Sequence, residues 1–395
     1  MFADISQAPD VQSLARRLEH GGALSCTGIG APAQPFLAAL LQKIFPHRPI
    51  IAITTDLKTQ ESFQQDLETW LPQLPTSNSQ LLFYPAWEIL PHEDRLPHAD
   101  VISDRLQTLA SLSEDLKLKT QNSKLIVASV TALLQKTFPP GEIQNRTRTL
   151  ARGDKIAPLD LIEQLEDQGY QPEAQVSQKG EIALRGGIVD VWPLTSPWPA
   201  RLEFFGDELE SLREFDPLTQ ISRGEILSVT LPPAGELGIL KQRQNEGGRA
   251  ENETALATLL DYLPPETIFL LCEPEQLALR ANEYALQIPA GDPFFISWPD
   301  LLAELNRRGF TAVALNEAAE TGGDNPQSAI RNSPRSTPTV RSPSARRKRQ
   351  SPRRSAVNFS IKCTAGCART TPSMSFATTM ANGNGLRKSG RNSMK

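Results

Sequence analysis

The sequence has little cysteine, little histidine and no long apolar run, and each shortage argues against a class of protein. Its 395 residues include four cysteines, too few and too scattered for a disulfide framework, which favours a reducing cytoplasm. No run of about 18 apolar residues occurs, so we expect no transmembrane helix and no membrane partner. The N-terminal stretch MFADISQAPD is acidic and polar, unlike a secretory signal peptide.

The few potential metal ligands are poorly spaced. Cys363 and Cys367 are separated by three residues, with no second pair or histidine nearby. His92 and His98 lie in a proline-rich stretch that offers no third ligand. Neither arrangement predicts a zinc site. The central part of the chain also lacks a nucleophile next to a base, so we expect no catalytic residue, no metal and no cofactor.

Charge is divided unevenly along the chain. Residues 321–395 carry 15 Lys and Arg against one acid, which leaves 26 basic and 44 acidic residues in 1–320. The net charge of residues 1–320 is thus about −18. A segment this acidic has no general positive surface that would attract nucleic acid. The remaining 321–395 segment is rich in Ser, Arg, Thr and Pro and poor in large aliphatics, so we expect a disordered basic tail.

Residues 1–135 alternate strand-like and helical patterns. Apolar runs at 23–27, 49–54, 81–84 and 125–130 are separated by helical stretches, which predicts βαβ units and a mainly parallel sheet. The segment 246–320 contains another buried strand at 267–271, which we expect to rejoin that sheet. The predicted fold is therefore an α/β, RecA-like and helicase-like parallel sheet, interrupted by a small inserted domain.

The loop after the first strand occupies the place of a phosphate-binding loop but lacks its chemistry. The G-x-x-x-x-G-K-[ST] pattern needs Lys for the terminal phosphates and Ser or Thr for magnesium. The eight positions here start at Ser25, include Gly28 and Gly30, and end in Ala31 and Pro32. Pro32 also removes a backbone donor from the helix N-terminus. We expect no ATP hydrolysis, although an ordinary tight turn would explain the loop equally well.

A second nucleotide signature is also incomplete. In active helicase folds a strand comparable to 267–271 ends in Asp-Glu, and the Asp positions magnesium. Cys272 occupies the Asp position here, and a thiol is a poor ligand for that hard cation. The two defects together predict a nucleotide fold without nucleotide chemistry.

Residues 136–245 predict a compact α+β domain. After a Pro- and Gly-containing linker at 135–144 comes an amphipathic helix at 158–168, followed by short strands at 181–184, 188–192 and 201–205. Charged residues lie inside these otherwise apolar strands. A one-faced antiparallel sheet with its polar side in water explains most such charges.

Two segments resemble a known family. The stretch YPAWEILPHEDRLPHADVISDRL at 84–106 is similar to a signature of the transcription-repair coupling factors (Mfd). The stretch GEIALRGGIVDVWPLTSPWPARLEFFGDELESLREFDP at 180–217 resembles a pattern shared by that family and by the excision-repair helicase subunit UvrB. The incomplete phosphate loop, the Trp87 segment and Gly187, where the helicase has Asp, favour the coupling factors. The resemblance covers about residues 10–290.

The resemblance implies a function in nucleotide excision repair. In both families the inserted domain docks UvrA, so the chain would be a non-catalytic adaptor that recruits UvrA to RNA polymerase stalled at DNA damage. The implied contact residues are Arg185, Arg201 and Phe205, with Glu203 and Phe204 beside them. The family contacts RNA polymerase and DNA through further domains, which are not visible here, so we expect a truncated or frame-shifted product.

Three alternatives remain open from the sequence. The charges of the inserted domain could serve only ion pairs within it, for example between Arg201 and Glu203. The chain could instead be a UvrB-type DNA-dependent ATPase. Finally, the tail could bind nucleic acid nonspecifically through its basic run at 346–349.

Overall fold

The computed structural model describes residues 5–73, 79–118, 124–246, 256–317 and 362–365. Its largest element is a seven-stranded sheet in the order β15-β1-β14-β13-β2-β4-β3, in which all strands except β15 run parallel. The strands are β1 (Ala23–Thr27), β2 (Ile50–Thr54), β3 (Gln80–Tyr84), β4 (Lys124–Ser129), β13 (Ile268–Cys272), β14 (Thr311–Asn316) and β15 (Lys362–Ala365). The predicted helicase-like α/β fold is confirmed.

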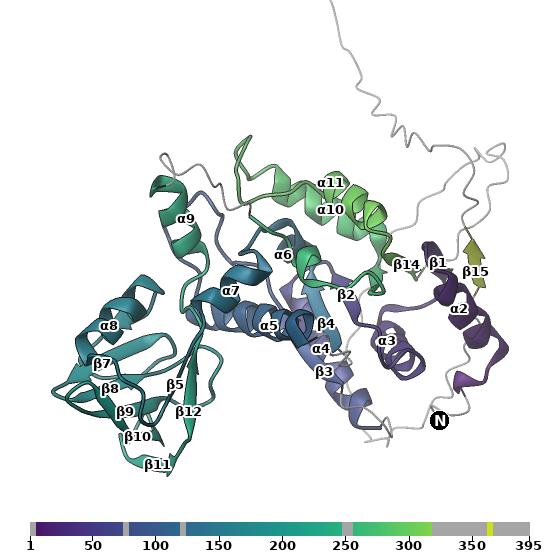
Figure 1. Cartoon of the computed structure of the whole chain (residues 1–395). Coiled ribbons are helices and arrows are strands. Elements are labelled where there is room, and N and C mark those ends of the chain that lie inside the picture. Colours follow the sequence, from purple (N-terminus) through teal and green to yellow (C-terminus); the bar gives the residue numbers. More distant parts are fainter. Residues whose placement is uncertain (1–4, 74–78, 119–123, 247–255, 318–361, 366–395) are drawn as a thin grey trace, which may run out of the picture. The chain divides into compact units, whose positions relative to one another are not determined.

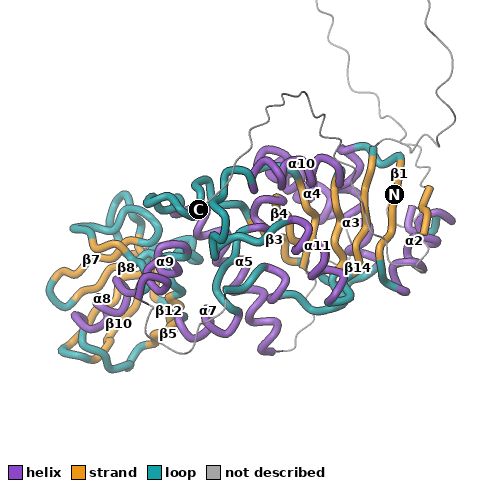
Figure 2. Tube along the Cα trace, turned by 90° about the horizontal axis from the view of Figure 1, so that it is seen from above, coloured by secondary structure: helices purple, strands orange, loops and turns teal. Residues whose placement is uncertain are grey.

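Helices cover both faces of this sheet (Figure 1, Figure 2). On one face lie α2 (Pro9–His20), α3 (Gln34–Ile44) and α4 (Leu57–Trp70); the other carries α5 (Ala99–Leu118), α6 (Val130–Leu134), α10 (Pro274–Ala285) and α11 (Trp298–Arg307). Alternate residues of each strand enter the two cores, so that Ile51 and Ile53 join one core and Ile50 the other. A parallel sheet covered on both faces explains why its strands are continuous apolar runs.

A six-stranded sheet in the order β11-β10-β9-β8-β7-β6 forms the middle of the chain. Its strands are β6 (Gln171–Pro172), β7 (Glu181–Arg185), β8 (Ile188–Val191), β9 (Ala200–Phe205), β10 (Glu208–Phe215) and β11 (Ser222–Glu225). Helix α8 (Pro158–Asp167) packs on β7 and β8 (Figure 1). Two further strands, β5 (Arg148–Ala151) and β12 (Ser228–Leu231), pair antiparallel beside it.

The C-terminus of α8 is fixed against the segment that leaves this region. Gly169 follows the helix in a left-handed conformation, with φ of 88°. Its backbone N–H donates to the backbone carbonyl of Glu166 at 2.8 Å. The N–H groups of Ala234 and Gly235 both donate to the carbonyl of Gln168. A Cβ atom on Gly169 would come within 2.7 Å of the Gly235 nitrogen, so this contact needs glycine.

Two helices in this part of the chain were not predicted. The predicted linker at 135–144 contains the start of a helix, α7 (Pro140–Arg146), because Pro140 suits the first helical position. A short 3₁₀ helix, Leu259–Tyr262, precedes β13. Helix α9 (Leu237–Glu246) begins inside the inserted segment and was not predicted.

Strand β14 was also missed, although it lies between β1 and β13 in the sheet. Its residues alternate in burial, and Gly309 precedes it, but this short run was not distinguished from the stretch that leads into the tail. Most of the predicted disordered tail, including the basic run at 346–349 and Cys367, lies outside the described residues. Residues Lys362–Ala365 form β15, which pairs antiparallel with β1 and was not expected.

Candidate functional site

The loop that replaces a phosphate-binding loop is closed by the chain's own side chains. Gly28 has φ of 80°, and Ala31–Ala33 form a single 3₁₀ turn before α3 begins at Gln34. The Nε2 atom of Gln34 donates to Glu273 Oε1 at 2.9 Å and to the carbonyl of Ile29 at 3.3 Å. Because Ile29 and Gln34 are buried, the loop packs inward.

Glu273 joins this loop to two neighbouring strands. It follows β13, and its Oε1 atom also accepts the N–H of Glu317 beyond β14 at 3.0 Å. Glu273 has φ of 56°, a conformation that is costly for a residue with a Cβ atom. Burial raises the pKa of the adjacent Cys272 thiol, which therefore stays protonated. A carboxylate next to the loop would repel phosphate rather than hold it.

The second candidate site is the outer face of the six-stranded sheet. The pairing register places Asp190 opposite both Ala183 and Arg201, and Glu203 opposite both Ile188 and Ser211. These residues share one face because directly paired residues point to the same side. The opposite face packs on α8 through buried side chains of the larger core, namely Ile182, Val189, Val191 and Leu202.

A buried carboxylate lies at the centre of the outer face. The side chain of Asp190 is 0% exposed. Its Oδ1 atom accepts Arg201 Nε at 2.8 Å, and its Oδ2 atom accepts Arg201 Nη2 at 2.9 Å and also contacts Arg185 Nη2. The hydrogen bonds with Asp190 raise the pKa of Arg201. The ion-pair alternative is thus present, but the partner of Arg201 is Asp190 rather than Glu203.

The five predicted contact residues do not share one environment. Arg185 is 46% exposed, Phe205 is 77% exposed, and Glu203 is partly exposed while it accepts the Ser211 hydroxyl at 2.6 Å. In contrast, the Arg201 side chain is 15% exposed. Phe204 lies on the opposite face, where it packs against the core. The structure therefore brings together Arg185, Glu203 and Phe205 on the accessible face and separates Phe204 from them.

Two tight turns place Arg185 and Phe205 at the same end of the sheet. Phe204 N–H donates to the carbonyl of Gly187 at 2.8 Å, which joins the β7–β8 turn to β9. A Cβ atom on Gly187 would lie 2.9 Å from the Phe204 carbonyl oxygen, so β9 approaches closely only because glycine stands there. The helicase pattern has Asp where this chain has Gly187, and in this chain the close approach of β9 requires the glycine.

The resemblance segment at 84–106 has a structural role that the sequence did not reveal. Arg105 on α5 is fully buried, and its Nε and Nη2 atoms donate to the two carboxylate oxygens of Glu236 at 2.7 and 2.9 Å. Trp87 Nε1 donates to the same carboxylate at 2.9 Å, and Thr137 Oγ1 at 2.7 Å. Glu236 was not singled out because nothing in the local sequence near 236 indicates a partner 131 positions away.

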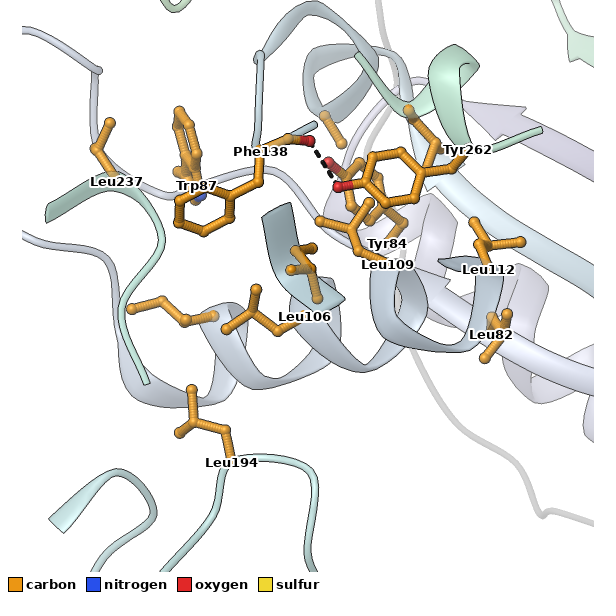
Figure 3. Packing of buried hydrophobic residues seen from close by; sticks show 14 of the residues in the cluster. Leu82, Tyr84, Trp87, Leu106, Leu109, Leu112, Phe138, Leu194, Leu237 and Tyr262 are labelled. Carbon is orange, nitrogen blue, oxygen red and sulfur yellow. Dashed lines mark hydrogen bonds between the residues drawn. The ribbon is translucent and has the colours of Figure 1, made fainter. Parts of the chain in front are cut away.

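Aromatic rings surround this ion pair. The Arg105 guanidinium lies 4.3 Å from the centroid of the Tyr84 ring and 4.6 Å from that of Trp87. Figure 3 shows Trp87 among Phe138, Leu106 and Leu237, and Tyr262 donating to the Phe138 carbonyl at 2.6 Å. Burial alone would lower the pKa of Arg105, but Glu236 outweighs it and raises that pKa. The cluster joins the Trp87 segment and α5 to the residues that follow the six-stranded sheet.

Within the described residues, no group of three His, Cys, Asp or Glu side chains is arranged to hold a metal ion. His92 and His98 are both exposed, and His98 Nδ1 lies 3.6 Å from Asp100 Oδ2. The described helices include none that is long and apolar enough to cross a membrane.

Comparisons with known proteins match the region of the six-stranded sheet to one family and about half of the chain to named relatives. Residues 149–237 match the family described as the UvrB interaction domain. The transcription-repair-coupling factor of Haemophilus influenzae is 32% identical over 235 residues, which is 51% of this chain and 20% of that protein. The factor of Escherichia coli is 30% identical over 48% of this chain and 15% of its own length. The factor of Bacillus subtilis is 28% identical over 66% of this chain and 21% of its own length. The chain thus spans about a fifth of the length of these relatives.

Proposed function

We propose that this chain, a relative of the transcription-repair-coupling factors with a UvrB interaction domain at 149–237, is an adaptor module that docks UvrA. In this proposal it recruits UvrA to RNA polymerase stalled at DNA damage. The contacts with polymerase and DNA are assigned to portions of a coupling factor that this chain does not span. The observation that carries the proposal is Phe205, which is 77% exposed at the same end of the sheet as the half-exposed Arg185.

The outer face of the sheet has the properties of a protein-binding surface. Exposed aromatic and arginine side chains are the types that most often dominate binding energy. Arg185 is the last residue of β7 and Phe205 the last of β9, in a sheet whose other face is buried, so little backbone freedom would be lost on binding. Glu203 and Arg213, 3.7 Å apart, add polar groups beside them. Arg201 and Phe204 are proposed to act from within the domain rather than at the surface.

Replacing Phe205 with alanine is expected to weaken UvrA binding about 10- to 100-fold, because truncation of a central aromatic contact typically costs about 2 kcal/mol or more. The measurement is a titration of the chain with purified UvrA by calorimetry or interferometry. Arg185→Ala should give a similar loss. The melting temperature should hardly change, since both side chains are substantially exposed.

Leu286→Ala is the matched control, because Leu286 is 88% exposed and follows α10 in the parallel-sheet region. Its affinity for UvrA should equal that of the unaltered chain. Unchanged binding by the Phe205→Ala, Arg185→Ala double variant would sink the proposed surface.

The chain is also proposed to lack ATP turnover, in contrast to a UvrB-type ATPase. Adding ATP and Mg²⁺ is expected to change the melting temperature of the chain by no more than about 1 °C. A ligand that does not bind the folded state cannot stabilise it by mass action. Phosphate release should equal the background with and without DNA. A melting temperature that rises with ATP concentration, or phosphate release above background, would instead favour the ATPase.

A further inference from the structure

We propose that the outer edge of β1 is a strand-docking site that recognises main-chain groups, and that residues 362–365 of the same chain fill it as β15. This edge belongs to the parallel sheet and is separate from the face proposed to dock UvrA. Three observations support the site: the direction of the main-chain groups of β1, the register of β15, and the composition of the edge.

The main-chain groups of β1 alternate between its two sides. The carbonyl of Gly22 accepts the N–H of Ala312 at 3.1 Å, so it faces β14. Residues two apart along a strand direct their N–H and C=O groups to the same side. Ser25 and Thr27 lie at odd spacings from Gly22, so their N–H and C=O groups point away from β14. A strand laid along that side of β1 meets the main-chain donor and acceptor of both residues.

The register of β15 matches this side of β1. β15 lies beside β1 in Figure 1 and runs antiparallel to it. Thr364 lies opposite Ser25, and Lys362 lies opposite Thr27. In an antiparallel ladder, opposite residues whose main-chain groups face each other exchange two N–H···O=C bonds. An extended segment with other side chains would therefore fit the same edge, provided that proline is absent from the two facing positions.

The edge of β1 lacks the features by which exposed strands avoid pairing. The outermost strand of the six-stranded sheet, β11, carries Arg223 and Glu225 and has a register shift beside it. Both features discourage the addition of a further strand. In contrast, β1 reads ALSCT, without charge or proline, and pairs with β14 in unbroken register. Its Leu24 and Cys26 side chains are buried. Such an apolar, regular edge favours pairing with another strand.

The course of the chain assigns the docked strand to the same molecule. Asn316, the last residue of β14, pairs with Thr27 from one side, and Lys362, the first residue of β15, pairs with Thr27 from the other. The two positions are thus two strand spacings apart, about 10 Å. The 317–361 segment between them is long enough to span this distance. A segment tethered so close to its site has a higher effective concentration than a second copy in dilute solution.

Hydrogen exchange of the whole chain, followed at the Ser25 and Thr27 amides, tests the site. Thr364→Pro removes the main-chain N–H that faces Ser25. Both amides are expected to exchange at least about tenfold faster in this variant than in the unaltered chain, because they lose their protection. Thr364→Ala keeps every main-chain group and should leave the exchange rates unchanged. The amide of Ile51, in the centre of the sheet, should exchange equally in all variants and reports that the sheet is intact.

Ala365→Pro is the matched control. The N–H of Ala365, next to Thr364, points away from β1, so proline there removes no bond to β1. Its exchange rates should stay within about twofold of the unaltered chain. Equal acceleration by the two proline variants, or no acceleration by Thr364→Pro, would overturn the docking site.

The concentration of the chain distinguishes the two possible sources of the strand. If β15 comes from the same molecule, protection of Ser25 and Thr27 stays constant over about a hundredfold range of chain concentration, as expected of an intramolecular contact. Protection that rises with concentration would show that a second copy supplies the strand, and would overturn the assignment to the same chain.

Discussion

Replacing Glu236 with alanine is expected to lower the free energy of unfolding by about 3–5 kcal/mol, the usual cost of removing one partner from a buried ion pair. Arg105 would keep its charge in a fully buried position without a counter-ion. Trp87 Nε1 and Thr137 Oγ1 would also lose their shared acceptor. Urea denaturation with linear extrapolation measures the change.

The comparison is an exposed ion pair in the same chain. Arg280 and Glu283 on α10 are 3.0 Å apart and about half exposed, so Glu283→Ala should cost no more than about 0.5 kcal/mol. Replacing both buried partners, Arg105→Met with Glu236→Leu, should recover part of the loss because no uncompensated charge remains. A cost below about 1 kcal/mol for Glu236→Ala would contradict the role given to this pair.

Gly169→Ala is expected to cost about 2–4 kcal/mol, which combines a positive-φ penalty with a backbone clash. The new Cβ atom would lie 2.7 Å from the Gly235 nitrogen and 2.9 Å from its Cα, and neither is the end of a flexible side chain. Relief of the clash would separate the end of α8 from the segment that leads to Glu236. The same denaturation measurement reports the loss.

Gly153→Ala separates the two causes. Gly153 has φ of 90°, close to the 88° of Gly169, but no atom lies within 4 Å of the Cβ position. It should therefore carry only the conformational penalty, about 1 kcal/mol. Equal losses for the two alanine variants would show that the close approach of Gly235 contributes nothing.

Much of the site could be predicted from local sequence. Residue types alone show that Ala31 and Pro32 cannot supply the chemistry of a phosphate loop. The alternation of side chains along a strand, applied strictly, would also have placed Phe204 and Phe205 on opposite faces. The strands near 181–205 were predicted because β-branched and aromatic residues between glycines form hairpins without distant help.

The sequence by itself thus determined the α/β character, the short strands of the inserted domain and the loss of the nucleotide signatures. Only the tertiary structure decided that Asp190 pairs with Arg201, that Gln34 donates to Glu273, and that Glu236 pairs with Arg105. The reason is physical: propensity and periodicity act over a few neighbouring residues, whereas these partners lie 11, 239 and 131 positions apart. Which charge is buried, and with which counter-ion, depends on the pairing of strands and the packing of distant segments.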